Sequence, residues 1–198
     1  MITVLVIVVI VLGLSALLYS GRGRARGSGG RRLKRQFGPE YDRVVADRDG
    51  DVRAAEQELD ERVRRHGSLR ERPLSPSARA QYVAEWAALQ ERFVASPHEA
   101  VTEADELLAR LARDRGFPGA ERFEEQWAAL SVHHAYFVEG YRDVHTAARG
   151  RSGTEEMREA MVEARGLFEA LAGEPPVATG GRRLASPGGR GSAAPSPQ

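Results

Sequence analysis

The first apolar stretch of the chain is continuous rather than periodic. Residues 2–19 contain no charged residue, and 13 of these 18 residues are Ile, Leu or Val. A helix of this length reaches about 27 Å, close to the hydrocarbon thickness of a bilayer. A single buried strand would be far shorter. We therefore predict a single transmembrane helix over residues 2–19.

A cleaved signal peptide is the alternative for this stretch. Such a peptide needs a basic start and small residues before its cleavage point. No Lys or Arg precedes the apolar run, and "SALLYSGRG" carries Leu and Tyr where a small residue is needed. The sequence favours an uncleaved anchor and leaves an exported or secreted protein as the alternative.

From residue 37 to residue 173 the apolar positions recur with the period of a helix, and no useful alternating strand pattern interrupts them. The predicted fold class is therefore all-α: a transmembrane helix followed by a small multi-helix bundle over residues 37–173. The predicted core faces are Phe37, Tyr41, Val44 and Val45; Val52, Ala55, Leu59 and Val63; Tyr82, Trp86, Leu89 and Phe93; Val101, Ala104, Leu107, Leu108 and Leu111; Phe123, Trp127 and Leu130; and Met157, Met161, Ala164, Phe168 and Leu171.

Local signals place several helix ends. Ser75 followed by Pro76 predicts a capped helix start. Ser96 with Glu99, and Ser152 with Glu155, have the spacing of capping boxes. The first two helical segments of the bundle are compatible with one helix bent at Gly50. Beyond the bundle, residues 174–198 are rich in Gly, Pro, Ser and Ala, and we expect them to form a disordered tail.

The net charge of +1 hides a segregation of charge along the chain. Residues 20–36, interpreted as a juxtamembrane linker, carry seven cations and no acid, whereas residues 37–198 hold 22 basic and 28 acidic residues, a net charge of −6. We call these cations the basic collar: Arg22, Arg24, Arg26, Arg31, Arg32, Lys34 and Arg35.

The basic collar predicts the orientation of the chain in the membrane. Cations beside a span remain on the cytoplasmic side, so the N-terminus is expected outside and the bundle in the cytoplasm. Anionic lipid headgroups are the expected partners of the collar. A nucleic-acid partner is not expected, because the collar has no aromatic residue on which a base could stack and the rest of the chain is acidic.

The segment "SVHHAYFVEGYRDVH", residues 131–145, holds three of the five histidines. If residues 132–149 form one helix, His134 and His145 lie on one stripe but about 16 Å apart along the axis, too far to share a metal ion. Neither has a metal-binding residue three or four positions away. We predict packed histidines rather than a metal site, and solvated carboxylates at Glu103, Asp105 and Glu106.

Other chemistry has no clear sequence signal. The chain has no cysteine, phosphate-binding glycine loop or nucleophile elbow. No catalytic residue, cofactor or metal is therefore predicted, and the protein is not expected to be an enzyme. A metal-binding or enzymatic helical module remains a weak alternative.

Two stretches carry a family resemblance: "RRLKRQFGPEYDRVVADRDGDVRAAEQELDERVRRH" and "RPLSPSARAQYVAEWAALQERFVASPHEAVTEADELL". They resemble an uncharacterised family of actinobacterial membrane-anchored helical proteins, with "FGPEYDR" as the most specific piece. The likeness extends from about Leu33 to Leu171, and the chain departs from it near His133, where relatives are expected to have an acidic residue, a histidine and a proline. The resemblance implies an anchored helical protein and no known activity.

The leading hypothesis is a membrane-tethered cytoplasmic protein that acts as an interaction module or scaffold for an unidentified protein partner. An anchor, an orienting collar and a helical bundle without a catalytic constellation motivate it.

Overall fold

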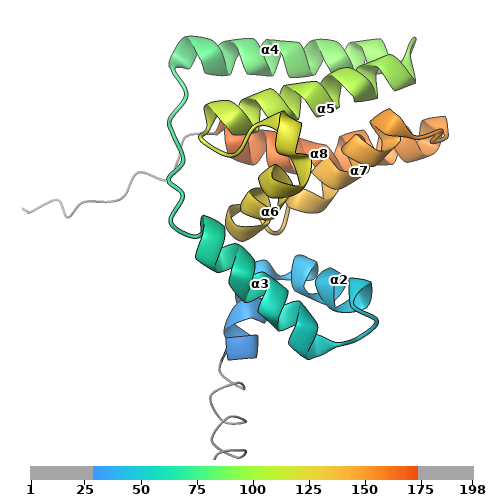
Figure 1. The fold of residues 1–198 in the computed structure, drawn as a ribbon. Helices are drawn as coiled ribbons and strands as arrows, with labels where there is room; N and C mark the ends of the chain where they lie inside the picture. The colour runs from blue at the N-terminus through green and yellow to red at the C-terminus, as the bar shows by residue number, and fades with distance from the viewer. Residues whose placement is uncertain (1–28, 174–198) are drawn as a thin grey trace, which may run out of the picture.

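The computed structural model describes residues 29–173, and every regular element among them is helical (Figure 1). A helical segment over residues 29–37 comes first. The elements that follow are α2 (Pro39–Asp47), α3 (Val52–His66), α4 (Pro76–Phe93), α5 (Pro97–Asp114), the 3-10 helix η1 (Ala120–Arg122), α6 (Phe123–His133), α7 (Val138–Arg149) and α8 (Thr154–Ala172). The prediction of an all-α bundle is confirmed for this part of the chain.

The predicted span at 2–19 and the predicted tail at 174–198 lie outside the described residues. Within residues 29–173, no helix is both long enough and apolar enough to cross a membrane.

Helices α4 to α8 form the larger part of the molecule, which we call the bundle. Helix α5 lies in its middle and packs against α4, α7 and α8. All five residues predicted for its core face are buried. On α8, Met157, Met161, Ala164, Phe168 and Leu171 are also buried as predicted. The helical periodicity therefore identified the buried faces of α5 and α8.

Residues 29–66 form a smaller N-terminal lobe below the bundle in Figure 1. Its apolar cluster is closed by Val132 and Ala135, which come from the end of α6 and the turn after it. Leu33 is only 1% exposed in this cluster. The folded part of the chain therefore begins before residue 37, and the second half of the predicted linker is a helix packed on the lobe.

Glycine is required where this first helix turns into α2. Gly38 has a φ of +52°, and a Cβ atom at this position would lie 2.7 Å from the ring of Tyr136. The backbone conformation strongly favours glycine, whereas the Tyr136 ring is 63% exposed and could move aside. Pro39 then starts α2 at a position where no helical N–H is needed.

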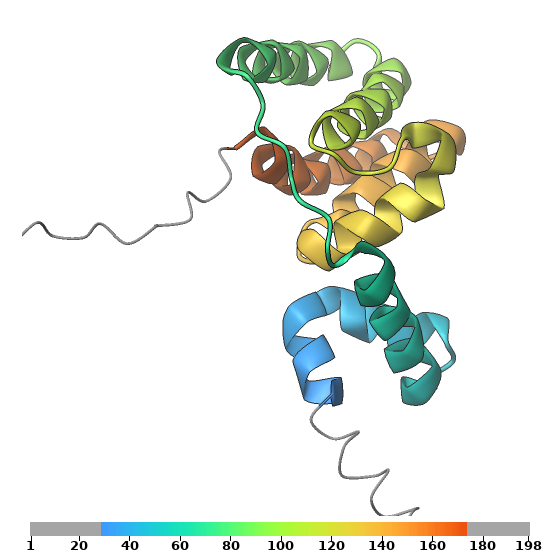
Figure 2. The same ribbon diagram turned by 60° about the vertical axis from the view of Figure 1, so that its left-hand side comes forward.

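Residues 67–75 connect the lobe to the bundle as an extended segment that runs along one side of the molecule (Figure 2). Arg115 holds this connection in place. Its main-chain oxygen accepts a 2.8 Å hydrogen bond from the Arg72 N–H, and its Nη1 donates a 2.8 Å bond to the Arg72 carbonyl. The side chain of Arg115 is only 1% exposed, so this contact lies inside the protein.

The helix starts predicted from capping residues were confirmed only in part. Ser75 caps α4 by accepting a bond from the Ala78 N–H, as predicted, whereas Ser96 makes no side-chain cap at α5. At α8 the capping pair is shifted by one residue, because the Gly153 N–H donates to Glu156.

The region around Gly50 also differs from the sequence expectation. Asp49 and Gly50 both have positive φ values, so α2 and α3 are separate helices rather than one bent helix. Val52, predicted to be in the core, is 45% exposed because it is the first residue of α3.

Candidate functional site

The segment that holds three histidines is not one continuous helix. Helix α6 ends at His133 and α7 begins at Val138, so the predicted common stripe of His134 and His145 is wrong. The Phe137 N–H donates to the His134 carbonyl in a turn, and the chain changes direction there. This turn places Ala135 in the cluster of the N-terminal lobe, a tertiary contact that helical periodicity does not reveal.

His145 is paired with a carboxylate from another helix. Its Nδ1 lies 3.0 Å from Oδ1 of Asp105 on α5, and its ring stacks on Phe123 with a centroid separation of 3.4 Å. Arg149 donates a 2.7 Å bond to the same carboxylate. Asp105 is only 7% exposed, so its prediction as a solvated carboxylate is wrong, whereas Glu103 and Glu106 are exposed as predicted.

His134 contacts the extended connection between lobe and bundle. Its Nε2 lies 2.9 Å from Oε1 of Glu71, and Arg115 pairs with the other carboxylate oxygen of Glu71. The contact with His134, followed by the contact with Arg115, lowers the pKa of Glu71 to about 2. The charged carboxylate of Glu71 therefore attaches the extended connection, residues 67–75, to the bundle.

The remaining histidines of this region also have structural partners. Nε2 of His133 lies 3.0 Å from the His66 carbonyl oxygen, at the point where α3 ends. Burial lowers the pKa of His66. In residues 29–173, no group of three or more metal-binding side chains is placed to hold an ion.

A cluster of arginines surrounds Trp127, where the lobe meets the bundle. The guanidinium carbons of Arg43, Arg62 and Arg142 lie 4.7, 4.5 and 4.7 Å from its ring centroid. Buried Glu40 pairs with both Arg43 (2.8 Å) and Arg62 (2.7 Å). Because carboxylates neutralise these cations, the cluster joins two parts of the fold rather than presenting an open anion site. Sequence reasoning placed Trp127 in the core and gave no signal for its cationic neighbours.

The structure describes only part of the basic collar. Arg22, Arg24 and Arg26 precede the first described residue. The other four cations are exposed on the helical segment 29–37: Arg31, Arg32, Lys34 and Arg35. Arg32 pairs with Asp60 at 3.2 Å and Lys34 with Asp42 at 2.9 Å, so part of the collar is fixed to the surface of the lobe.

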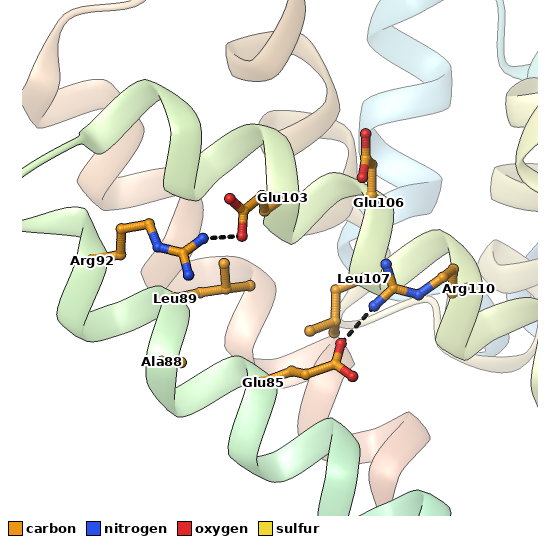
Figure 3. A pocket seen from close by; sticks show the side chains of 8 residues that line it. All are labelled: Glu85, Ala88, Leu89, Arg92, Glu103, Glu106, Leu107 and Arg110. Carbon is orange, nitrogen blue, oxygen red and sulfur yellow. Dashed lines mark hydrogen bonds and ion pairs between the residues drawn. The ribbon is translucent and has the colours of Figure 1, made fainter.

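A hollow of about 280 Å³ lies between α4 and α5 (Figure 3). Leu89 and Leu107 form its apolar floor, and two ion pairs cross its rim: Arg92 with Glu103, and Arg110 with Glu85 at 2.6 Å. Figure 3 shows these pairs extending from one helix to the other. They fasten the α4–α5 hairpin and leave little apolar surface open to a ligand.

The outward face of α4 is exposed and largely apolar. Its inward face carries Tyr82, Trp86 and Leu89, which are buried, as predicted. The opposite face carries mostly small or apolar residues that are all exposed: Ala80, Val83, Ala84, Ala87 and Ala88, with the exposed charged residue Glu91 toward its C-terminal end and Val94 just beyond the helix. Among the described residues, this outer face is the surface best suited to contact another molecule.

Comparisons of the chain with known proteins found no relative. No family model, no curated protein and no solved structure matches the chain. The resemblance to an actinobacterial family therefore stays a prediction.

Proposed function

We propose that this protein is a membrane-tethered interaction protein whose helical bundle binds a protein partner in the cytoplasm. The observation that carries the proposal is the exposed apolar face of α4. Contiguous apolar surface on a soluble domain commonly marks a site of protein association. The histidine and arginine clusters have partners inside the fold, which supports binding over catalysis as the role of the bundle.

The position of α4 supports a partner from the cytoplasm. The described chain starts at the free end of the N-terminal lobe, and α4 lies at the opposite end of the molecule (Figure 1, Figure 2). If residues 2–19 span the membrane, the lobe is next to the bilayer and α4 is the element farthest from it. The outer face of α4 then points into the cytoplasm, where a soluble protein can reach it.

Proximity labelling in living cells tests this proposal. A labelling enzyme fused at Gln198 should modify cytoplasmic proteins, and Ala84→Glu with Ala87→Glu should remove at least one protein from the labelled set. Ala46→Glu is the matched control, because Ala46 is an exposed alanine on α2. Identical labelled sets for all three chains, or labelling confined to exported proteins, would contradict the proposal.

A further inference from the structure

Helices α4 and α8 run in opposite directions, because Trp86 lies against Phe168 whereas Phe93, later on α4, lies near Met161, earlier on α8. Trp86 stacks on Phe168 with ring centroids 4.7 Å apart and closes the space between the helices. Farther along, the helices leave a groove of about 210 Å³. We call this space the α4–α8 groove, and the residues that line it are Gln90, Phe93, Arg158, Met161, Val162 and Arg165.

Exposed valines lie in and beside the groove. Val162 is 60% exposed on α8, and on the α4 side Val83 and Val94 are 51% and 87% exposed. Val83 and Val94 lie on the same line along α4 as Gln90, seven residues before it and four after it. The groove and these valines therefore lie along one side of α4, with Val83 and Val94 on either side of the polar Gln90.

Both charged residues that line the groove are arginines. Arg158 and Arg165 are seven residues apart on α8, which places them about 10.5 Å apart along one side of the groove. Arg158 pairs with Glu155 (2.6 Å) and Arg165 with Glu169 (2.7 Å), and neither glutamate lines the groove. Exposed pairs of this kind contribute little stability, so a ligand can recruit both guanidinium groups at small cost.

We propose that the α4–α8 groove binds an amphipathic helix of a cytoplasmic protein, with acidic residues two helical turns apart that pair with Arg158 and Arg165. Apolar residues at i, i+3, i+4 and i+7 of that helix cover Phe93, Met161 and Val162. This inference rests on the proposed function and adds to it the binding site and the class of partner.

Charge and position disfavour two other occupants. The segment 174–198 of the same chain carries three arginines and one glutamate, a net charge of +2, which does not complement two arginines. An anionic bilayer has the right charge, but the groove lies on α4 and α8, away from the end of the lobe where the described chain starts. An acidic helix fits both the charge and the location.

Two synthetic peptides test the groove directly on the full-length protein in lipid nanodiscs. Both are helical with leucine at i, i+3, i+4 and i+7; one carries two glutamates seven residues apart and the other carries lysines there. Fluorescence anisotropy should show binding of the glutamate peptide at least tenfold tighter than binding of the lysine peptide. The double variant Arg158→Glu/Arg165→Glu should reverse this preference, which also shows that it is folded.

The matched control is Arg64→Glu/Arg65→Glu, which changes two exposed arginines that pair with Glu61 within α3 of the N-terminal lobe, and it should keep the wild-type preference. Equal affinities for the two peptides, no binding of either, or a preference that Arg158→Glu/Arg165→Glu leaves unchanged overturns the assignment of the groove. Proximity labelling separates this failure from that of the proposed function. If the peptides fail while labelling of a cytoplasmic protein still depends on α4, the groove is wrong and the recruiting function stands.

Discussion

Glu71 shows at the scale of a single residue how the fold holds residues 67–75, the extended connection between lobe and bundle. Its carboxylate lies between His134 of the α6–α7 turn and the buried side chain of Arg115. The extended segment has no helix of its own, so contacts of this kind replace the hydrogen bonds that a helix would supply. Protonation of Glu71 in acid should therefore weaken the attachment of this segment to the bundle.

The lowered pKa of Glu71 predicts a loss of stability in acid. The pKa falls from 4.5 to about 2 on folding, so the stabilisation is fully present above pH 4.5 and is lost as the pH drops from 4.5 toward 2. A shift of this size corresponds to at most about 3 kcal/mol. Glu71→Gln should lower the free energy of unfolding at neutral pH and flatten its decline between pH 4.5 and pH 2, as measured by denaturant titration.

Glu121→Gln is the control for this titration. Glu121 has a side chain that is 71% exposed, and its nearest cation, Arg122, is 3.8 Å away. This variant should follow the wild-type pH profile. A Glu71→Gln profile as steep as that of the wild type would contradict the role of Glu71.

At the scale of helices, the sequence predicted correctly which face of a helix is buried where this depends only on the spacing of apolar residues. The core stripe of α5 and the Ser75 cap are local patterns, and both were found. The break between α6 and α7 was missed because it depends on contacts with a distant part of the chain, such as Tyr136 over Gly38. The prediction that Asp105 is solvated was wrong for a similar reason, since its partner His145 comes from another helix.

Gly140 marks the closest approach of two helices and gives a prediction at this scale. A Cβ atom here would lie 2.4 Å from the main chain of α8 at Glu163 and Ala164, which cannot move aside like a flexible side chain. Gly140→Ala should therefore force α7 and α8 apart and destabilise the protein by about 1–3 kcal/mol. Thermal unfolding followed by circular dichroism measures this change.

Gly153→Ala provides the comparison, because a Cβ atom at Gly153 meets nothing within 4 Å. Its effect should stay below about 1 kcal/mol. If the two alanine variants unfold at the same temperature, the crossing of α7 and α8 does not depend on glycine.

The first helix of the lobe gives a second prediction about elements. Residues 29–173 expressed alone should be soluble and strongly helical, since their apolar faces cover one another. A fragment that starts at residue 37 lacks Leu33, which is 1% exposed, and should lose about 2 kcal/mol or more of stability. Leu33→Ala in the longer fragment should reproduce much of that loss, whereas Arg35→Ala on the exposed side should not. Equal stability of the two fragments would place the start of the folded part at residue 37.

At the scale of the whole molecule, the arrangement links the predicted membrane anchor to a surface at the opposite end. Only nine residues, 20–28, separate the predicted span from the first described residue. A chain of nine residues extends at most about 30 Å, so the N-terminal lobe would remain near the bilayer. The bundle would then project α4 and the α4–α8 groove away from the membrane. This geometry serves recruitment only if the bundle faces the cytoplasm.

Orientation is therefore the prediction on which the function depends. The predicted span has seven cations on its C-terminal side and no Lys or Arg on its N-terminal side. Under the positive-inside rule, a reporter that is active only in the cytoplasm should be active when fused at Gln198, and a reporter that requires export should be silent. Replacing all seven cations of the basic collar with Ser or Gln should give mixed topology, because no other charge near the span opposes export.

The structure adds a sharper version of this test by separating the collar into two groups. Arg32 and Lys34 are paired with Asp60 and Asp42 on the lobe, so their charges are partly neutralised once the lobe has folded. Arg22, Arg24 and Arg26 are closest to the predicted span, and replacing these three alone should shift the topology more than replacing Arg32 and Lys34. A reporter exported with the wild-type chain, or a shortened chain released into the medium, would instead support the exported protein and remove the basis for cytoplasmic recruitment.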